Sequence, residues 1–327
     1  MKRVLIVAVS ALMAAALNAD VTGGTPAFAA AAPAAAQGEK TLEEICREGP
    51  RSREVEIQKI EPIKVFDNLY HVGPCYVSVW ILTTPDGHIM FDTAQEPFIE
   101  HTLANIAKIG INLRDIKYIL INHGHLDHAG GAYRFQQMTG ARVLAVEADW
   151  PMIEAMAGQP GGRDPERKPN QMPRRDVVVR DGHKIDLGDQ HLTLYAGPGH
   201  TPGVLVATGI VVKDGAARFN AVWGNSGDGG EGLAGAERGL INATNMATIK
   251  DVRVIMQTHA WQGANGPPEG GIHERAKRLA GRKAGDPHPY VDPAERWLTN
   301  VTQDLAAAQK RLAEERAKAA GAPGAAR

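Results

Sequence analysis

The stretch His123-Gly124-His125-Leu126-Asp127-His128 places four side chains that can bind a metal within six residues. The apolar run before it, residues 116–121, has the length and β-branched content of a buried strand. Gly124 permits a sharp turn at the end of that strand, and a helical pattern over residues 129–138 follows. Because zinc accepts neutral imidazole and carboxylate oxygen as ligands, the stretch predicts a zinc site at a strand end.

A solvated, histidine-rich loop is the alternative interpretation. The chain has 12 histidines in 327 residues, so three of them with an aspartate in six positions argue against a chance cluster. Ligands two residues apart can reach one ion, and the next pair can reach a second ion a few ångströms away. The stretch therefore favours a metallohydrolase with two metal ions.

Two further histidines follow strand-like segments elsewhere in the chain. His200 lies between glycines and prolines in residues 197–203, a rigid loop that is poorly suited to a packed core residue. His259 ends the apolar run 252–258. Either histidine alone would be assigned to a structural role, but together with the first cluster they complete two sets of three ligands.

These motifs resemble the metallo-β-lactamase superfamily. The resemblance rests on His-x-His-x-Asp-His at 123–128, on Gly-His-Thr-Pro-Gly at 199–203 and on the single strand-end histidine at 259. Further stretches resemble the subclass B3 β-lactamases in order and spacing; these are residues 68–73, 81–88, 91–93, 129–131 and 289–293. The similarity spans about residues 56–312.

The resemblance implies a role for each matching residue. His123, His125 and His200 would hold one Zn²⁺, and Asp127, His128 and His259 the other, giving two zinc ions per chain. Asp92 would orient a ligand histidine through a hydrogen bond and fix its tautomer. The alternative for Asp92 is a carboxylate in a strand-end turn.

The chain departs from the family pattern on the side that faces the substrate. Many relatives carry a metal-bridging aspartate after the strand at 219–223, but Gly224-Asn225-Ser226 follows here. Asp228 is the fallback for that carboxylate. Subclass B3 enzymes typically show Ala-Asp-Ser at this place, so Ser226 fits the pattern and Asn225 does not. We assign both residues to substrate binding.

The resemblance implies an αβ/βα four-layer sandwich, in which two mixed sheets face each other with helices outside. The sequence pattern permits that α/β fold, with helices expected at 97–108 and 129–138. We expect four segments: a signal peptide at 1–29, a low-complexity extension at 30–52, the hydrolase domain at 53–316 and a disordered tail at 317–327.

The N-terminus predicts export. Lys2 and Arg3 precede an apolar stretch too short for a membrane span, and residues 27–29 form a small-x-small cleavage motif. We therefore expect a periplasmic or secreted monomer that acts on a small molecule. The formal net charge is −1, and it becomes −2 once Lys2, Arg3 and Asp20 are removed. This charge gives no basic excess that would favour nucleic acid or a membrane surface as partner.

The only two cysteines, Cys46 and Cys75, leave two alternatives open. In an exported protein they can form a disulfide that pins the N-terminal segment, or Cys75 can be a small buried apolar residue. Their spacing does not suggest metal ligands. We assign the remaining histidines to structural roles; these are His71, His88, His101, His183, His191, His273 and His288.

The ligand set indicates a mechanism in which two zinc ions activate a shared water, whose pKa falls to about 7. Asp127, a ligand beside that water, is the predicted catalytic residue because it can take the proton. We expect an exported di-zinc hydrolase that opens the amide of β-lactams. The alternatives are a lactonase or a thioester or ester hydrolase of the same superfamily, and an exported zinc-binding protein without activity.

Overall fold

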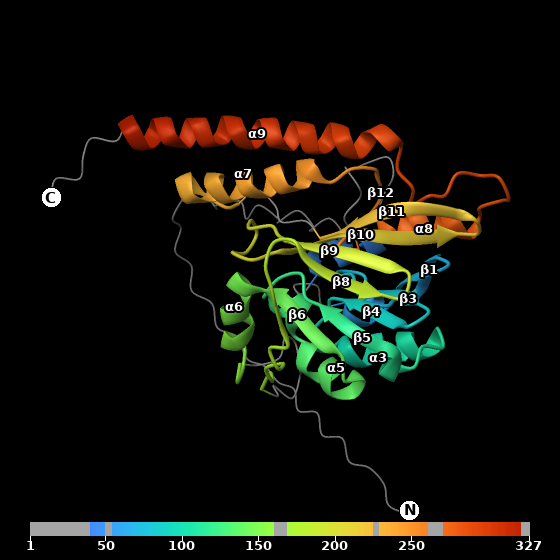
Figure 1. Cartoon of the computed structure of the whole chain (residues 1–327). Coiled ribbons are helices and arrows are strands. Elements are labelled where there is room, and N and C mark those ends of the chain that lie inside the picture. Colours follow the sequence, from blue (N-terminus) through green and yellow to red (C-terminus); the bar gives the residue numbers. More distant parts are fainter. Residues whose placement is uncertain (1–39, 50–53, 160–168, 225–228, 261–270, 322–327) are drawn as a thin grey trace, which may run out of the picture. The chain divides into compact units, whose positions relative to one another are not determined.

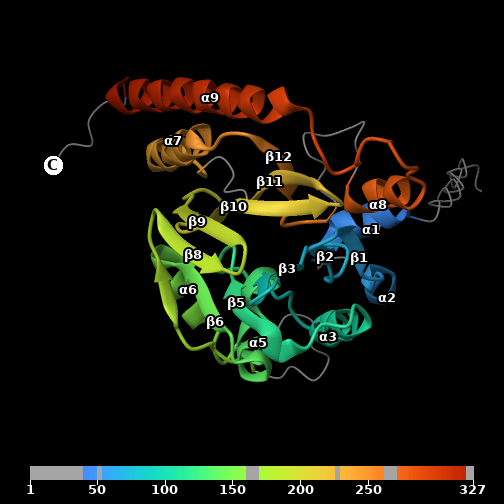
Figure 2. The same ribbon diagram turned by 45° about the vertical axis from the view of Figure 1, so that its right-hand side comes forward.

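The computed structural model describes residues 40–49, 54–159, 169–224, 229–260 and 271–321. Within them the chain forms two mixed β-sheets that face each other (Figures 1 and 2). No helix among these residues is both long enough and apolar enough to cross a membrane.

The first sheet has seven strands in the order β1 to β7. Strands β1 to β4 pair antiparallel, and β4 to β7 pair parallel. Its strands are β1 (Ile63–Phe66), β2 (Leu69–His71), β3 (Trp80–Thr84), β4 (Gly87–Phe91), β5 (Ile116–Leu120), β6 (Arg142–Val146) and β7 (Val177–Val179).

The second sheet has five strands in the order β12-β11-β10-β9-β8. All neighbours pair antiparallel except β11 and β12, which are parallel. Its strands are β8 (His183–Leu187), β9 (Gln190–Ala196), β10 (Leu205–Asp214), β11 (Ala217–Trp223) and β12 (Val252–Met256). Both sheets are thus mixed, as the sequence predicted.

Helices cover the outer faces of the sheets. Figures 1 and 2 show α3 and α5 outside the first sheet, and α7 and α9 outside the second. The α-helices are α1 (Leu42–Glu48), α2 (Val55–Gln58), α3 (Ile99–Lys108), α4 (Leu126–Ala129), α5 (Ala132–Thr139), α6 (Trp150–Ala155), α7 (Gly232–Thr248), α8 (Ile272–Ala280) and α9 (Ala294–Gly321). This arrangement confirms the predicted four-layer sandwich.

Side chains that alternate along a strand contribute to two different hydrophobic cores. In β3, Leu82 joins the core between the sheets, whereas Ile81 joins the core beneath the helices that cover the first sheet. Trp297 and Val301 of α9 pack with Val206 and Val222 on the outer face of the second sheet. Successive side chains of a strand point to opposite faces, so a buried strand supplies both cores.

The helix expected at 129–138 is divided in two. The chain forms α4 and α5 with Gly130 and Gly131 between them. A Cβ on Gly130 would lie 2.5 Å from the carbonyl oxygen of Leu126, and one on Gly131 would lie 2.7 Å from that of Thr93. The close approach of these backbones therefore requires glycine at both positions.

Helices lie in both segments that were expected to flank the hydrolase domain. Within the extension at 30–52, α1 forms because Thr41 and Glu44 make a reciprocal capping box. At the other end, α9 continues to Gly321, past the boundary at 316. Alanines of high helix propensity and a Lys318–Glu315 ion pair of 2.6 Å favour this last turn.

Candidate metal centre

The candidate ligands lie at strand ends that meet at one edge of the sandwich. His123 follows β5, and Asp92 follows its parallel neighbour β4. In the second sheet, β9 and β11 are both antiparallel to β10, and β12 is parallel to β11. The carboxyl ends of β9 and β12 therefore share an edge, which brings together the loops that carry His200 and His259.

His123, His125 and His200 form the first close group, with ligand atoms all within 4.8 Å of one another. Nδ1 of His125 lies 3.1 Å from Nε2 of His123 and 3.0 Å from Nε2 of His200. His123 is buried, His125 is half-buried and His200 is exposed. This group is open to solvent on one side, as a substrate site requires.

Asp127 and His128 form a second close group, but its third member is His123. The Oδ2 atom of Asp127 lies 3.5 Å from Nε2 of His128. The ring of His259 stands nearly perpendicular to that of His128, with 5.1 Å between centroids. The structure thus brings all six predicted ligands into one cluster, with His259 at the side of His128.

Hydrogen bonds on the far side of three rings fix their orientation. Nδ1 of His128 lies 2.8 Å from Oδ2 of Asp92, and Nδ1 of His123 lies 2.8 Å from Oδ1 of Asn122. Nδ1 of His259 lies 2.7 Å from the carbonyl oxygen of Tyr76. When Nδ1 donates to an oxygen, Nε2 keeps its lone pair for a metal.

Asp92 takes the position that the sequence assigned to it. Its backbone is left-handed, with φ of 59°. Its Oδ1 accepts a hydrogen bond from the backbone N–H of Asn122 at 2.7 Å, which leaves Oδ2 for His128. Thr93 donates its hydroxyl hydrogen to the carbonyl oxygen of His128 at 2.8 Å. The Asp-Thr pair therefore holds both the ring and the backbone of His128.

Asp149 is a positioning residue that the sequence did not reveal. Its fully buried carboxylate accepts hydrogen bonds from the backbone N–H of Gly124, the hydroxyl of Thr201 and the backbone N–H of Gly203, each at 2.7 Å. These bonds tie the loop of His123 and His125 to the loop of His200. A single acidic residue before a helix has no sequence signature that would predict this contact.

The electrostatics of the cluster favour a cation. Burial and the neighbouring imidazoles lower the pKa of His123 far below its usual range, and burial with His128 lowers that of His259 to about 4. Burial opposes charge on His128, but Asp127 and Asp92 outweigh it and raise its pKa to about 9. The two carboxylates thus favour a positive charge between them, which a metal cation can supply.

The residues present fit zinc. Nε2 of His128 is buried and has no hydrogen-bond partner among the described residues, although an unpaired buried polar atom costs about 1–3 kcal/mol. A bound ion would satisfy it. The donors are imidazole nitrogens and one carboxylate. This donor set favours zinc, because calcium and magnesium bind oxygen ligands. The predicted substrate-binding residues Asn225 and Ser226, and the fallback Asp228, lie outside the described residues.

Comparisons with known proteins bear on the family and on the fold. The model of the "Metallo-beta-lactamase superfamily" matches residues 72–209. The fold is similar to BJP-1, a subclass B3 metallo-β-lactamase of Bradyrhizobium japonicum. The TM-score is 0.60 and the sequence identity 28%, covering 79% of this chain and 96% of that one.

Curated relatives show weaker and shorter similarity. The probable metallo-hydrolase YybB of Bacillus subtilis is 27% identical over 132 residues, 40% of this chain and 55% of that protein. A hydroxyacylglutathione hydrolase of Maricaulis maris is 33% identical over 88 residues, 27% of either chain. The chain thus spans about half or less of the length of these curated relatives.

Proposed function

Because this chain is a member of the metallo-β-lactamase superfamily, we propose that it is an exported di-zinc hydrolase that opens the amide of β-lactams. The observation that carries the proposal is the convergence of five imidazoles and Asp127 at one edge of the sandwich, with Asp92 behind His128. The likeness to BJP-1 over 96% of that enzyme supports β-lactams as the substrate class.

The chain's own residues supply binding, orientation and proton transfer. When bound at such a site, zinc lowers the pKa of a water molecule and polarises a substrate carbonyl. His123, His125 and His200 would hold one ion, and Asp127, His128 and His259 the other. Asp149 and Asp92 would keep these ligands in place.

Asp127 is the proposed proton acceptor. Its side chain is 19% exposed, so it reaches the solvent-facing side of the cluster, unlike the fully buried His128. Although burial penalises the charge, His128 and His259 outweigh it and lower the pKa of Asp127. The carboxylate is therefore ionised at neutral pH and able to orient and accept a proton.

Hydrolysis of an ester, a lactone or a thioester is the second candidate function. The similarity to hydroxyacylglutathione hydrolases, 33% identity over 88 residues, favours it. The sequence argues against it, because no carboxylate directly follows β11, where many such relatives carry a metal-bridging aspartate. A zinc-binding protein without activity is a weaker candidate, since structural zinc is usually closed by four ligands.

A panel assay distinguishes these functions. Purified, zinc-loaded protein is assayed on a chromogenic cephalosporin, a penicillin, a carbapenem, lactones and thioesters under identical conditions. We expect β-lactam turnover that a chelator abolishes and that serine-directed inhibitors leave unchanged. Lactone or thioester turnover without any β-lactam turnover would establish the second candidate, and inactivity on the whole panel would favour the third. Export is tested by locating the protein after expression with residues 1–29 present and absent.

A further inference from the structure

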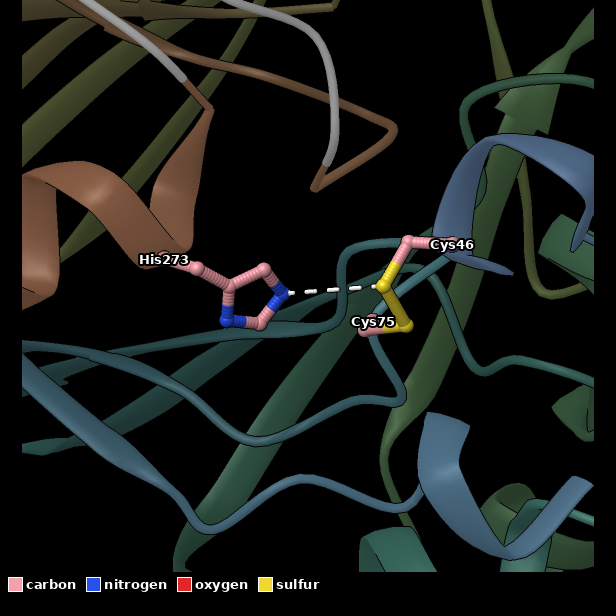
Figure 3. Close-up of side chains that lie close together, drawn as sticks. All are labelled: Cys46, Cys75 and His273. Atoms are coloured by element: carbon pink, nitrogen blue, oxygen red, sulfur yellow. Dashed lines mark hydrogen bonds between the residues drawn. A yellow bond between two sulfur atoms is a disulfide. The ribbon is translucent and has the colours of Figure 1, made fainter. Parts of the chain in front are cut away.

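A second group of potential metal ligands shares no residue with the candidate metal centre. Cys46 of α1, Cys75 of the loop after β2 and His273 of α8 place their ligand atoms within 4.8 Å of one another (Figure 3). The two cysteines form a disulfide, and Nε2 of His273 lies 3.9 Å from Sγ of Cys46. Spacing along the chain gave no indication of this group, because His273 lies 227 residues after Cys46.

The backbone around the cysteines is held by contacts other than the disulfide. The N–H of Cys75 donates to the carbonyl oxygen of Gln58 at 2.9 Å, and the side chain of Gln58 donates to the carbonyl oxygen of Gly49 at 3.2 Å. Both cysteines are fully buried. Opening the disulfide would therefore leave the two thiols close together in the same setting.

The spacing of the three atoms fits a tetrahedral zinc site. Zinc–sulfur bonds of about 2.3 Å and zinc–nitrogen bonds of about 2.0 Å at tetrahedral angles place sulfur about 3.5 Å from nitrogen and about 3.8 Å from the other sulfur. The sulfur–nitrogen distance is already 3.9 Å. The Cα atoms of Cys46 and Cys75 are 5.3 Å apart, so rotation of the cysteine side chains can supply the required sulfur separation.

His273 is suited to ligation and can be reached from solvent. Burial and then the charge of Lys277 lower its pKa, so the imidazole is neutral at pH 7 with a lone pair to offer. It also lines a cleft of about 280 Å³ between α1 and α8, together with Thr41, Glu43 and Glu274. This cleft offers an entry path and room for water as a fourth ligand.

We propose that Cys46, Cys75 and His273 form a redox-gated metal site that binds a thiophilic divalent ion such as Zn²⁺ when the disulfide is reduced. A dithiol reductant supplies two electrons and two protons, so the disulfide becomes two thiols and the reductant becomes a cyclic disulfide. Binding of the ion to both sulfurs and to Nε2 of His273 then releases the two thiol protons. In the oxidised protein the site is closed.

Cobalt(II) is the probe that tests this site. The six ligands of the candidate metal centre include no sulfur, so a thiolate-to-cobalt charge-transfer band reports on the cysteines alone. We expect the band in full-length protein reduced with a dithiol, after removal of the reductant under anaerobic conditions, and none in the oxidised protein. Cys75→Ser should abolish it. Because the readout is independent of hydrolysis, failure of the proposed function leaves this test unaffected.

The His273→Ala variant separates a three-ligand site from a simple dithiol. We expect at least a tenfold loss of cobalt affinity in reduced His273→Ala and an unchanged affinity in His191→Ala, which removes a histidine exposed elsewhere. Near-ultraviolet circular dichroism of the reduced proteins reports whether the fold persists. Three results would overturn the proposal: no charge-transfer band in folded reduced protein, an unchanged affinity in His273→Ala, or loss of the fold upon reduction.

Discussion

Oδ2 of Asp92 lies 2.8 Å from Nδ1 of His128, and neither side chain is exposed to solvent. This contact directs Nε2 of His128, which has no hydrogen-bond partner among the described residues, toward Asp127 and His123. The left-handed backbone of Asp92 is tolerated because the N–H of Asn122 and the ring of His128 both need its carboxylate. The orientation of His128 is therefore set by a residue outside the predicted ligand set.

Asp92→Ala should weaken zinc binding by about 10- to 100-fold, the usual effect of removing the carboxylate behind a ligand histidine. Competition with a chromophoric chelator measures the change. Asp186→Ala is the matched control, because Asp186 makes the same contact with His191 on the surface, at 2.6 Å. If both variants keep wild-type affinity, Asp92 does not support a metal ligand.

Metal content should respond differently to the loss of His200 and of His259. We expect about two zinc ions per wild-type chain at saturation. His200 lies against His125, and His259 packs against His128. Each single alanine variant should therefore retain about one ion. His200→Ala should lose the ion of the first group, and His259→Ala should lose the other ion. Elemental analysis gives the count, and a single tightly bound ion in wild-type protein at saturating zinc would contradict the two-ion model.

Asp127→Asn should reduce turnover by about two orders of magnitude or more while leaving the fold intact. The amide keeps the size of the side chain but cannot accept a proton. Turnover is measured on whichever substrate the panel identifies, alongside zinc content and thermal unfolding. Near-normal turnover with both metals present would show that the carboxylate is dispensable.

Stability should fall at acidic pH because of His71. This histidine is fully buried, neither ring nitrogen has a hydrogen-bond partner among the described residues, and burial lowers its pKa to about 3. The unfolded chain takes up a proton near pH 6.5, whereas the native protein does so only near pH 3. Between these values the unfolded state binds more protons, so stability is lost as the pH decreases.

The buried His71 should reduce the free energy of unfolding by about 1.4 kcal/mol for each pH unit below 6.5, or by about 2 kcal/mol at pH 5. His71→Phe keeps an aromatic ring beside Trp80. Between pH 7 and pH 5 its free energy of unfolding should decrease by about 2 kcal/mol less than that of the wild type. Urea unfolding at the two pH values measures this difference, with His191→Ala as the exposed control. Equal pH dependence in His71→Phe and wild type would show that His71 does not titrate as described.

The sequence predicted those parts of the site that depend on a motif within a single segment. Strand-end histidines and the His-x-His-x-Asp-His spacing located the six candidate ligands, because a buried strand followed by a turn is visible in a single segment. Asp149 and the neighbourhood of His273 were missed, because each depends on segments that meet only in three dimensions. Asp149 lies 25 and 54 residues from two of its partners, Gly124 and Gly203.

Helix boundaries were missed for a different reason. Gly130 and Gly131 read as part of a helix, yet the backbone of Thr93 packs against Gly131, and Thr93 comes from the strand end that carries Asp92. The division between α4 and α5 is thus a consequence of assembling the site. Sequence periodicity contains no information about that contact.

Asp149 provides the last prediction, because its carboxylate joins two ligand loops through three hydrogen bonds of 2.7 Å. Asp149→Ala leaves the buried N–H groups of Gly124 and Gly203 without acceptors, at about 1–3 kcal/mol each. We therefore expect a loss of several kcal/mol in unfolding free energy and at least a tenfold weaker binding of the zinc ion that His123, His125 and His200 would hold. The ion near Asp127 and His128 should be less affected, because Asp92 holds His128 from the other side. Thr201→Val removes one of the three bonds and should have a smaller effect on the same ion. Zinc titration with urea unfolding of both variants decides the matter: if Asp149→Ala weakens both ions equally, the carboxylate stabilises the domain as a whole and does not position the first group.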